Sequence, residues 1–251
     1  MSAYSALTAA GFRAQIRDLT TVFFTFAFPL IFLVVFGLIF RGQAVEESGY
    51  SYLSYTAAGV LSWGVANAAV FGTGFTLMQW RADDILRMIR MSPAPLSAVI
   101  GSRYVLALGV GLVQSVLFVG VAMLPGFDLT PSSRWPLLIP VMILGITSFL
   151  LLGVVIGSIA DTPESVAGIA NFLMLPMAFL SGSFFPLDAM PEWLQRISLV
   201  LPLRYLNDAV SAALTGRGEL SDIGMGCLGL VVFAVVFGAL AARTFRWTKK
   251  S

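Results

Sequence analysis

The sequence WPLLIPVMILGITSFLLLGVVIGSIA, from Trp135 to Ala160, contains no Asp, Glu, Lys, Arg or His. A helix of about 20 apolar residues is long enough to cross a hydrocarbon core about 30 Å thick. A charge at the centre of such a helix costs about 2.5–3.5 kcal/mol on insertion scales, so exclusion of charge over this whole length has a physical cause. The stretch is therefore predicted to span a membrane.

Five other stretches of similar length are equally free of charge and histidine. They are Leu19 to Phe40, Tyr52 to Met78, Tyr104 to Pro125, Val166 to Phe185 and Ile223 to Ala242. The first of them is too long for the apolar core of a signal peptide, and no A-x-A-like cleavage site follows it, so we expect it to be retained. The sequence predicts an all-α membrane protein with six transmembrane helices, forming a single membrane domain over residues 1–251.

Composition limits the functions that are open to this chain. Apolar residues make up 58% of it and charged residues 11%, against about 25% charged residues in soluble domains. Histidine is absent and the carboxylates are scattered through the connections, which argues against a membrane enzyme or a metal site. The only lysines are Lys249 and Lys250, and no G-x-x-x-x-G-K-[ST] motif is present, so we expect the chain to bind no nucleotide or other cofactor itself. The basic residues form no stripe suited to nucleic acid.

The distribution of basic residues predicts the orientation in the membrane. Placing both termini in the cytoplasm puts most of the 15 lysines and arginines on the inner side, as the positive-inside rule requires. The residues on that side are Arg13, Arg17, Arg81, Arg87, Arg90, Arg103, Arg243, Arg246, Lys249 and Lys250. We therefore expect both termini and the connection between spans two and three to be cytoplasmic.

That connection contains an amphipathic segment, residues 80–91, with the sequence WRADDILRMIRM. On a helical wheel Ala82, Ile85, Leu86 and Ile89 fall on one face, with arginines and aspartates around the rest. Two interpretations remain open from periodicity alone. The helix rests on lipid head groups, or it docks a soluble partner. The two aspartates among the arginines disfavour a purely lipid-facing role.

Two further segments lie outside the spans. Residues 1–18 have apolar and basic side chains at helical spacing, which predicts an interfacial helix leading into span one. Residues 186–216, between spans five and six, predict two short helices, the first opened by a proline and the second ending at Gly216. We expect this external segment to re-enter the outer leaflet, the alternative being an amphipathic hairpin lying on the membrane. Its marker residues are Pro186, Pro191, Trp193, Leu194, Pro202 and Tyr205.

Several polar, sulfur-containing and aromatic side chains within or at the ends of spans are candidates for a substrate path. They are Asn67, Asn171, Met174, Met177, Phe184 and Phe185. Intramembrane asparagines more often bond between helices, and methionine and phenylalanine more often pack, although their adaptable surfaces suit an apolar substrate. Gly153 and Gly157 form a G-x-x-x-G pair. We expect it to mark close helix packing within one subunit rather than dimerisation.

Three short motifs follow one another near the end of the chain: LSGSFFP at residues 180–186, MPEWLQ at 190–195 and LPLRY at 201–205. In this order they resemble the permeases of ABC-2-type exporters, particularly the drug-resistance branch that includes daunorubicin exporters. The resemblance covers nearly the whole chain. Asp83-Asp84-Ile85 stands where the family often has a glutamate and a glycine, so the individual docking contacts are not carried over.

The resemblance implies a transporter of two permease subunits, as a homodimer or heterodimer, with two cytoplasmic ABC ATPase subunits that bind ATP and Mg. It implies that residues 80–91 overlap a coupling helix that docks on the ATPase, and that spans one, two and five line the subunit interface and the substrate route. The coupling residues are then Arg81, Asp83, Asp84, Ile85, Leu86, Arg87 and Arg90.

The expected function is that of a permease subunit of an ATP-driven exporter in the inner membrane. It would move a hydrophobic drug or another amphiphilic small molecule. Export of a lipid, peptide or polysaccharide is the alternative within the family. A secondary carrier is the alternative outside it, and it normally keeps ionisable groups inside its spans. Without such groups or a nucleotide site, the chain has no energy source of its own.

Overall fold

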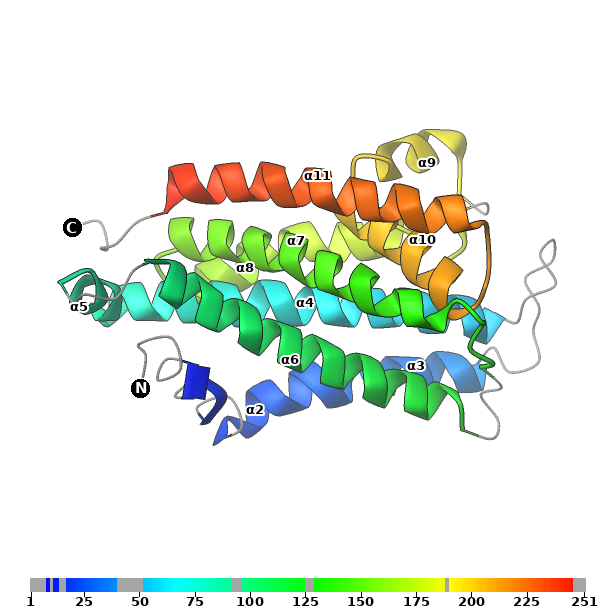
Figure 1. Cartoon of the computed structure of the whole chain (residues 1–251), viewed down its shortest axis with the longest axis horizontal. Helices are drawn as coiled ribbons and strands as arrows, with labels where there is room; N and C mark the ends of the chain where they lie inside the picture. The colour runs from blue at the N-terminus through cyan, green and yellow to red at the C-terminus, as the bar shows by residue number, and fades with distance from the viewer. Residues whose placement is uncertain are drawn as a thin grey trace.

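The structure is a computed structural model of the whole chain, and it describes residues 8–9, 11–13, 17–39, 52–91, 96–124, 129–187 and 190–245. Within these ranges it contains helices, turns and no strands. Six helical segments are long and apolar enough to cross a membrane, and they run alongside one another in one elongated bundle (Figure 1). The predicted all-α fold with six spans is confirmed.

The element bounds follow the charge-free stretches closely but not completely. The elements are α2 (Leu19–Val22), η1 (Phe23–Ala27), α3 (Phe28–Ile39), α4 (Tyr52–Ala82), α5 (Ile85–Met91), α6 (Leu96–Ala122), η2 (Trp135–Leu137), α7 (Leu138–Ile159), α8 (Pro163–Leu180), α9 (Glu192–Ser198), α10 (Pro202–Leu214) and α11 (Leu220–Thr244). Span one is α2, η1 and α3 together, span four is η2 and α7, and the other four spans are α4, α6, α8 and α11.

Span one changes its helical pitch because of a proline. Pro29 has no amide hydrogen, and its ring crowds the carbonyl of the residue four positions earlier, Thr25. The turn directly before it, η1, is a π-helix in which the Phe28 amide donates to the Phe23 carbonyl, and this wider turn gives the ring room. Asp18 caps the start of the span by accepting from the Thr21 amide at 3.1 Å. Hydrogen bonds from the Thr21 hydroxyl and amide lower the pKa of the Asp18 carboxyl.

The helices α4 and α7 form the core of the bundle, and most of their side chains are buried. Their backbones approach closely at the G-x-x-x-G pair. A Cβ on Gly153 would lie 2.7 Å from the Val70 carbonyl oxygen, and one on Gly157 would lie 2.6 Å from the Gly74 carbonyl oxygen. The expectation that this motif packs within one subunit is confirmed, because both glycines face α4 of the same chain.

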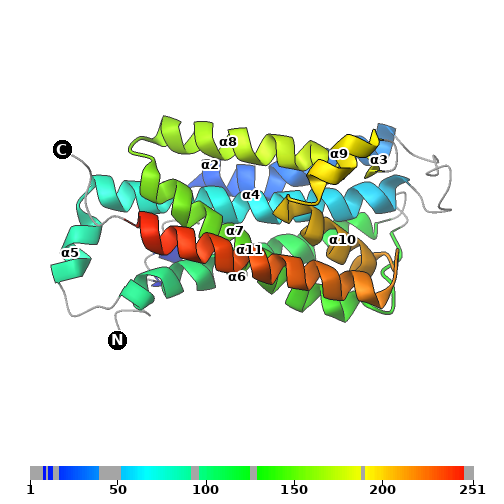
Figure 2. The same cartoon turned by 90° about the horizontal axis from the view of Figure 1, so that it is seen from above.

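Spans one, five and six lie around this core (Figure 2), and they leave apolar side chains exposed. Phe172 on α8 and Leu38 on α3 are examples of large hydrophobic residues that the chain itself does not cover. In water, exposed apolar surfaces of this kind would favour aggregation. On a multi-pass membrane protein they face lipid or another subunit.

Two predicted span boundaries were wrong. Helix α8 ends at Leu180, and residues 181–185 form a turn in which Gly182 has a φ of 76°. The absence of charge marks residues kept from water, and it does not distinguish the end of a helix from a buried turn. Helix α6 begins at Leu96, so it includes Arg103, which the sequence placed in the connection.

The short helices divide between the two ends of the bundle. The start of α2, the end of α11 and the whole of α5 lie at one end, and α9 and α10 lie at the other (Figure 1). Of the predicted N-terminal helix, residues 1–18, the described residues 8–9, 11–13 and 17 are helical. The rest of it lies outside the described residues, as do Arg246, Lys249 and Lys250.

Candidate coupling site and substrate route

Arg81, at the last turn of α4, holds the α5 end of the bundle together. Its side chain is 2% exposed and donates to the backbone carbonyls of Ser158 and Ala160 and, at 2.9 Å, to the carboxylate of Asp161. The last carbonyls of a helix have no intrahelical donor, and a cation placed there is also attracted to the negative end of the helix dipole. Arg81 therefore joins the end of α4 to the end of α7 and to the connection that leads into α8.

This placement corrects the predicted coupling segment. Arg81 was expected on the exposed face of one continuous helix over residues 80–91, but α4 continues to Ala82 and the chain then turns at Asp83 and Asp84. Asp84 has a φ of 55°, a left-handed conformation that short polar residues tolerate better than others. The helix that follows this turn is α5, from Ile85 to Met91.

Helix α5 lies across the end of the bundle rather than along it (Figure 2). Of the predicted apolar face, Leu86 is fully buried and Ile85 and Ile89 are half-buried, so these three side chains pack inward. The fourth member, Ala82 at the end of α4, is exposed. Arg87 and Met88 face outward, as do both aspartates of the preceding turn. The Arg90 side chain lies outside the part of the chain that the structure describes. The outward surface of α5 and the turn before it therefore carries both positive and negative charges beside the exposed Met88.

A second contact at this end joins α6 to α4. The Arg103 guanidinium lies over the Trp80 ring, with 4.0 Å between Cζ and the ring centroid. This distance is within the range of a favourable cation–π contact. Trp80, predicted to begin the coupling helix, instead belongs to span two and packs against the first turns of span three.

The six candidate substrate-path residues do not form one surface. Asn171 and Phe185 are exposed, whereas Met174, Met177 and Phe184 are buried within the subunit. The remaining candidate, half-buried Asn67, donates its amide to the Trp63 carbonyl of its own helix at 2.9 Å. Their role as a path stays a prediction.

Phe184 has a clear packing role. Its ring lies 5.9 Å from that of Phe32, 5.8 Å from Phe36, 5.4 Å from Trp63 and 5.5 Å from Phe179, measured between ring centroids. These are ordinary separations for aromatic pairs. The cluster holds the turn after α8 against spans one and two.

The external segment contains the two predicted short helices, with small shifts in their bounds. Pro191 lies one residue before α9 rather than at its first position, and the exposed Trp193 and half-buried Leu194 follow within α9. Helix α10 begins at the buried Pro202 and ends at Leu214, and the chain leaves it through Gly216, which has a φ of 74°. The half-buried Pro186 follows the turn after α8.

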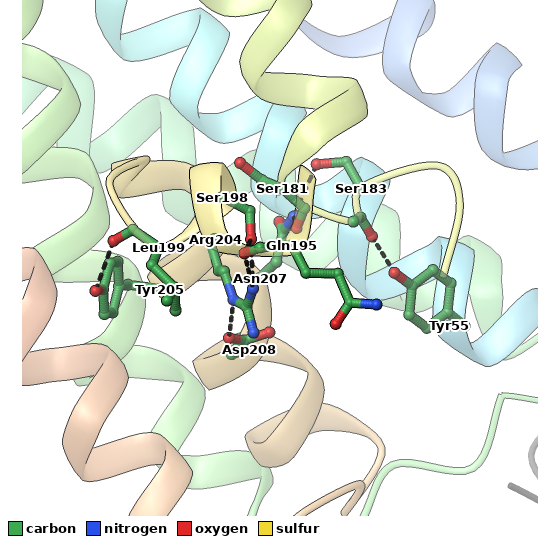
Figure 3. Close-up of polar contacts among 11 residues, drawn as sticks. Tyr55, Ser181, Ser183, Gln195, Ser198, Leu199, Arg204, Tyr205, Asn207 and Asp208 are labelled. Atoms are coloured by element: carbon green, nitrogen blue, oxygen red, sulfur yellow. Dashed lines mark hydrogen bonds and ion pairs between the residues drawn. The ribbon is translucent and has the colours of Figure 1, made fainter. Parts of the chain in front are cut away.

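A network of hydrogen bonds ties α10 to that turn (Figure 3). The Asn207 amide nitrogen donates to the Ser181 carbonyl and to the Ser183 hydroxyl, both at 2.8 Å. From the start of α4, the Tyr55 hydroxyl donates to the carbonyls of Gly182 at 2.5 Å and Phe185 at 2.9 Å. The turn at residues 181–185 is therefore held by side chains from two other elements.

Helix α10 is tied to α9 in the same region. The Arg204 guanidinium donates to the Ser198 hydroxyl, to the Gln195 carbonyl at 3.3 Å and to the Asp208 carboxylate at 3.4 Å. The Tyr205 hydroxyl donates to the Leu199 carbonyl at 2.8 Å. These bonds fix the short helices relative to each other, as non-helical backbone near a membrane requires.

Comparison with known proteins identifies the family of the chain. Residues 2–215 match the sequence model of the ABC-2 type transporter family. The chain belongs to this family. Among its relatives, nodulation protein J of Rhizobium leguminosarum bv. viciae is 27% identical over 90% of this chain and 88% of its own length.

Two further relatives of this ABC-2 transporter subunit cover similar shares of the chain. The daunorubicin resistance ABC transporter permease protein DrrB1 of Streptomyces coeruleorubidus is 28% identical over 87% of this chain and 77% of its own length. The inner membrane transport permease YadH of Escherichia coli K12 is 20% identical over 82% of this chain and 80% of its own length.

Sequence reasoning missed two of the polar residues that hold the turn after α8 in this ABC-2 subunit, Asn207 and Tyr55. Asn207 was not singled out, although it is the strongly polar side chain on the buried face of α10. Tyr55 was seen only as part of a charge-free stretch. The signal for Asn207 was available, because a buried amide in an otherwise apolar helix face needs partners.

Proposed function

We propose that the chain is the transmembrane permease subunit of an ABC exporter and that α5 receives the movement of a separate cytoplasmic ATPase. The observation that carries this proposal is the position of α5, which lies across one end of the bundle with a buried leucine inward and charged residues outward. The sequence has no phosphate-binding motif. Work against a gradient must therefore be supplied through contact with another subunit.

The contacts around Arg81 provide a route for that movement. Helix α5 packs against α4, and Arg81 at the end of α4 bonds to the end of α7 and the start of the connection to α8. A push on α5 would displace α4, and the bonds of Arg81 would carry α7 and α8 with it. The spans would then shift as rigid bodies rather than bend.

The orientation that suits this function places α5 and both termini in the cytoplasm. The chain is a multi-pass protein of the inner membrane, with six apolar helices and a relative described as an inner membrane transport permease. The end that carries α5 has exposed arginines, including Arg87 and Arg243, in agreement with the positive-inside rule. The external segment, with α9 and α10, would then face outward and enter the outer leaflet.

The partners that complete such a transporter are two ATPase subunits, which bind ATP and Mg, and a second permease subunit. The exposed apolar faces of spans one and five supply the surface for the second permease. Because these faces are largely apolar, association in the membrane would rest on close packing.

The substrate class that fits best is a hydrophobic drug or another amphiphilic small molecule. One relative carries daunorubicin resistance in its name. In this chain the exposed Asn171 lies on α8 and the exposed Phe185 lies in the turn after it, beside the exposed apolar residues of span five. A lipid, peptide or polysaccharide is the second candidate, because the exposed apolar faces suit other amphiphilic cargo as well.

Reversal of charge on α5 tests the coupling role. The double variant Arg87→Glu/Arg90→Glu should insert and fold as the native chain does but lose at least about tenfold in ATP-dependent export, because like charges then face each other at the docking surface. Export of daunorubicin into inverted vesicles and ATP hydrolysis by the co-isolated ATPase are measured together. The matched control is Arg196→Glu on α9, an exposed arginine on a short helix at the opposite end. Unaltered export by the double variant would exclude α5 as the coupling element.

A further inference from the structure

A strongly polar side chain lies exposed in the middle of span five. Asn171 is the ninth of the 18 residues of α8. At 1.5 Å of rise per residue, about 12 Å of helix separates it from Pro163 and about 14 Å separates it from Leu180. Because the hydrocarbon core is about 30 Å thick, the Asn171 amide lies near the centre of the membrane.

The amide of Asn171 makes no hydrogen bond with any residue that the structure describes. The other amide side chains deep within the spans are bonded or enclosed, since Asn67 donates to the Trp63 carbonyl at 2.9 Å and Gln114 is 2% exposed. Asn171 instead points away from its own subunit, on the exposed face of α8. An amide that faces hydrocarbon without a partner is strongly unfavourable, so a group from outside the chain must supply its bonds.

The residues around Asn171 form a face that another helix can approach closely. Gly168, one turn earlier, is exposed, and a Cβ there would meet nothing within 4 Å. Phe172, Leu175 and Phe179 continue the exposed face toward the end of α8. In Figure 2 α8 lies at one edge of the bundle, with no other helix beyond it. A small residue beside a polar one is typical of helix contacts within membranes.

The chemistry of an amide favours a second copy of itself as the partner. Its oxygen accepts and its nitrogen donates, so two asparagines that face each other satisfy both groups through reciprocal hydrogen bonds. In a two-fold symmetric contact the same surface of two identical chains meets, and a residue beside the axis meets its own counterpart. A substrate in transit would leave the amide without a partner between transport cycles, whereas a second copy covers it throughout.

We propose that the chain forms a homodimer in which the Asn171 amides of the two copies bond to each other beside a two-fold axis. This inference rests on the proposed function in one respect, that the transporter has a second permease subunit, and it identifies that subunit as another copy of this chain. A single polar pair among apolar residues fixes the register at which two helices meet. The pair therefore determines how the two α8 helices align.

Dimerisation of the full chain in lipid vesicles tests the pair. Copies that carry donor or acceptor fluorescent proteins at the C-terminus are mixed, and energy transfer is measured over a range of protein-to-lipid ratios. Asn171→Leu should weaken dimerisation about tenfold through loss of the hydrogen bonds, whereas Asn171→Gln, which keeps an amide, should weaken it less than about threefold. Leucine is favourable at a lipid-facing position, so insertion is retained. Equal dimerisation of the native chain and Asn171→Leu would overturn the proposal.

Cross-linking locates the contact. Cys227 is the one cysteine of the sequence, and Cys227→Ala supplies a background without thiols. In that background Leu175→Cys, one turn from Asn171, should give dimers with a short bismaleimide. Val235→Cys is the matched control, because Val235 is 66% exposed on α11, which lies on a different side of the bundle from α8 (Figure 2). Cross-linking no greater through Leu175→Cys than through Val235→Cys would refute the contact between α8 helices.

Export by the same variants separates this pair from a contact with cargo. Loss of export by Asn171→Leu with unchanged dimerisation would assign the amide to the substrate route and overturn the proposal. A transporter in which this chain pairs only with a different permease would overturn it as well. Dimerisation is measured without the ATPase, so its failure leaves the coupling role of α5 intact, and failure of coupling through α5 leaves the Asn171 pair intact.

Discussion

The two ends of α4 are held in the same way but by groups of different strength. At the α5 end, the buried cation of Arg81 donates to two backbone carbonyls and a carboxylate. At the α9 end, the neutral hydroxyl of Tyr55 donates to two backbone carbonyls. Hydrogen bonds made by a charged group are about twice as strong as neutral ones, so α4 is attached more firmly at the end that we assign to coupling.

The two ends also differ in their internal space. Beside Trp80 and Arg103, at the α5 end, the cavity has about 20 Å³, which is room for about one water. At the α9 end the cavity has about 370 Å³ and unpaired polar atoms around it. The two cavities differ in size, whereas each has beside it a buried polar atom without a hydrogen-bond partner among the described residues, Arg103 Nε at the α5 end and the Asn207 oxygen at the α9 end.

Arg81→Met is the strongest test of this difference. The substitution removes the donors of two buried carbonyls, while Asp161 remains accessible to water, so we expect a loss of about 3 kcal/mol in the free energy of unfolding. Unfolding in detergent is followed by circular dichroism. Arg87→Met, on exposed α5, is the control and should change stability by less than about 0.5 kcal/mol. A native-like unfolding curve for Arg81→Met would show that the firm attachment lies elsewhere.

Tyr55→Phe probes the other end of α4 with a smaller expected effect. The change deletes one hydroxyl donor and leaves the ring in place, so the loss should be about 1 kcal/mol, measured in the same unfolding experiment. If this loss equals or exceeds that of Arg81→Met, the two ends are attached equally firmly and the proposed asymmetry is wrong.

Arg196→Ala should have the smallest effect. Its pair with Glu192 on α9 is exposed, with 3.5 Å between nitrogen and oxygen, and such i,i+4 pairs contribute about 0.3–0.5 kcal/mol. The difference from the native chain should vanish in 1 M salt because exposed charges are screened. A salt-independent loss above about 1 kcal/mol would mean that α9 contributes to the stability of the bundle through contacts other than this pair.

The six spans, the packing of Gly153 and Gly157 and the end of α10 at Gly216 were predictable from the sequence. Each follows from a rule that acts over a short stretch: lipid excludes charge, close helices need small residues, and a left-handed residue ends a helix. The resemblance of three short motifs to one family also pointed to the ABC-2 type transporters, and the family match confirms it.

Other features depended on contacts between distant parts of the chain. The burial of Arg81 follows from the carbonyls at the end of α7, which no periodicity in residues 80–91 contains. The helical wheel also assumed that the helix continues through Asp83 and Asp84, where it turns. The turn after α8 was equally hidden, because its residues are as free of charge as the helix before them.

Gly59 on α4 lies directly against the backbone of Ser183, and a Cβ there would overlap the Ser183 backbone. A clash with the main chain cannot be relieved by choosing another side-chain rotamer. The close contact between Gly59 and Ser183 therefore fixes α4 and the turn after α8, which are far apart in the sequence, relative to each other. Any residue with a Cβ at position 59 would therefore displace the turn at residues 181–185 from α4.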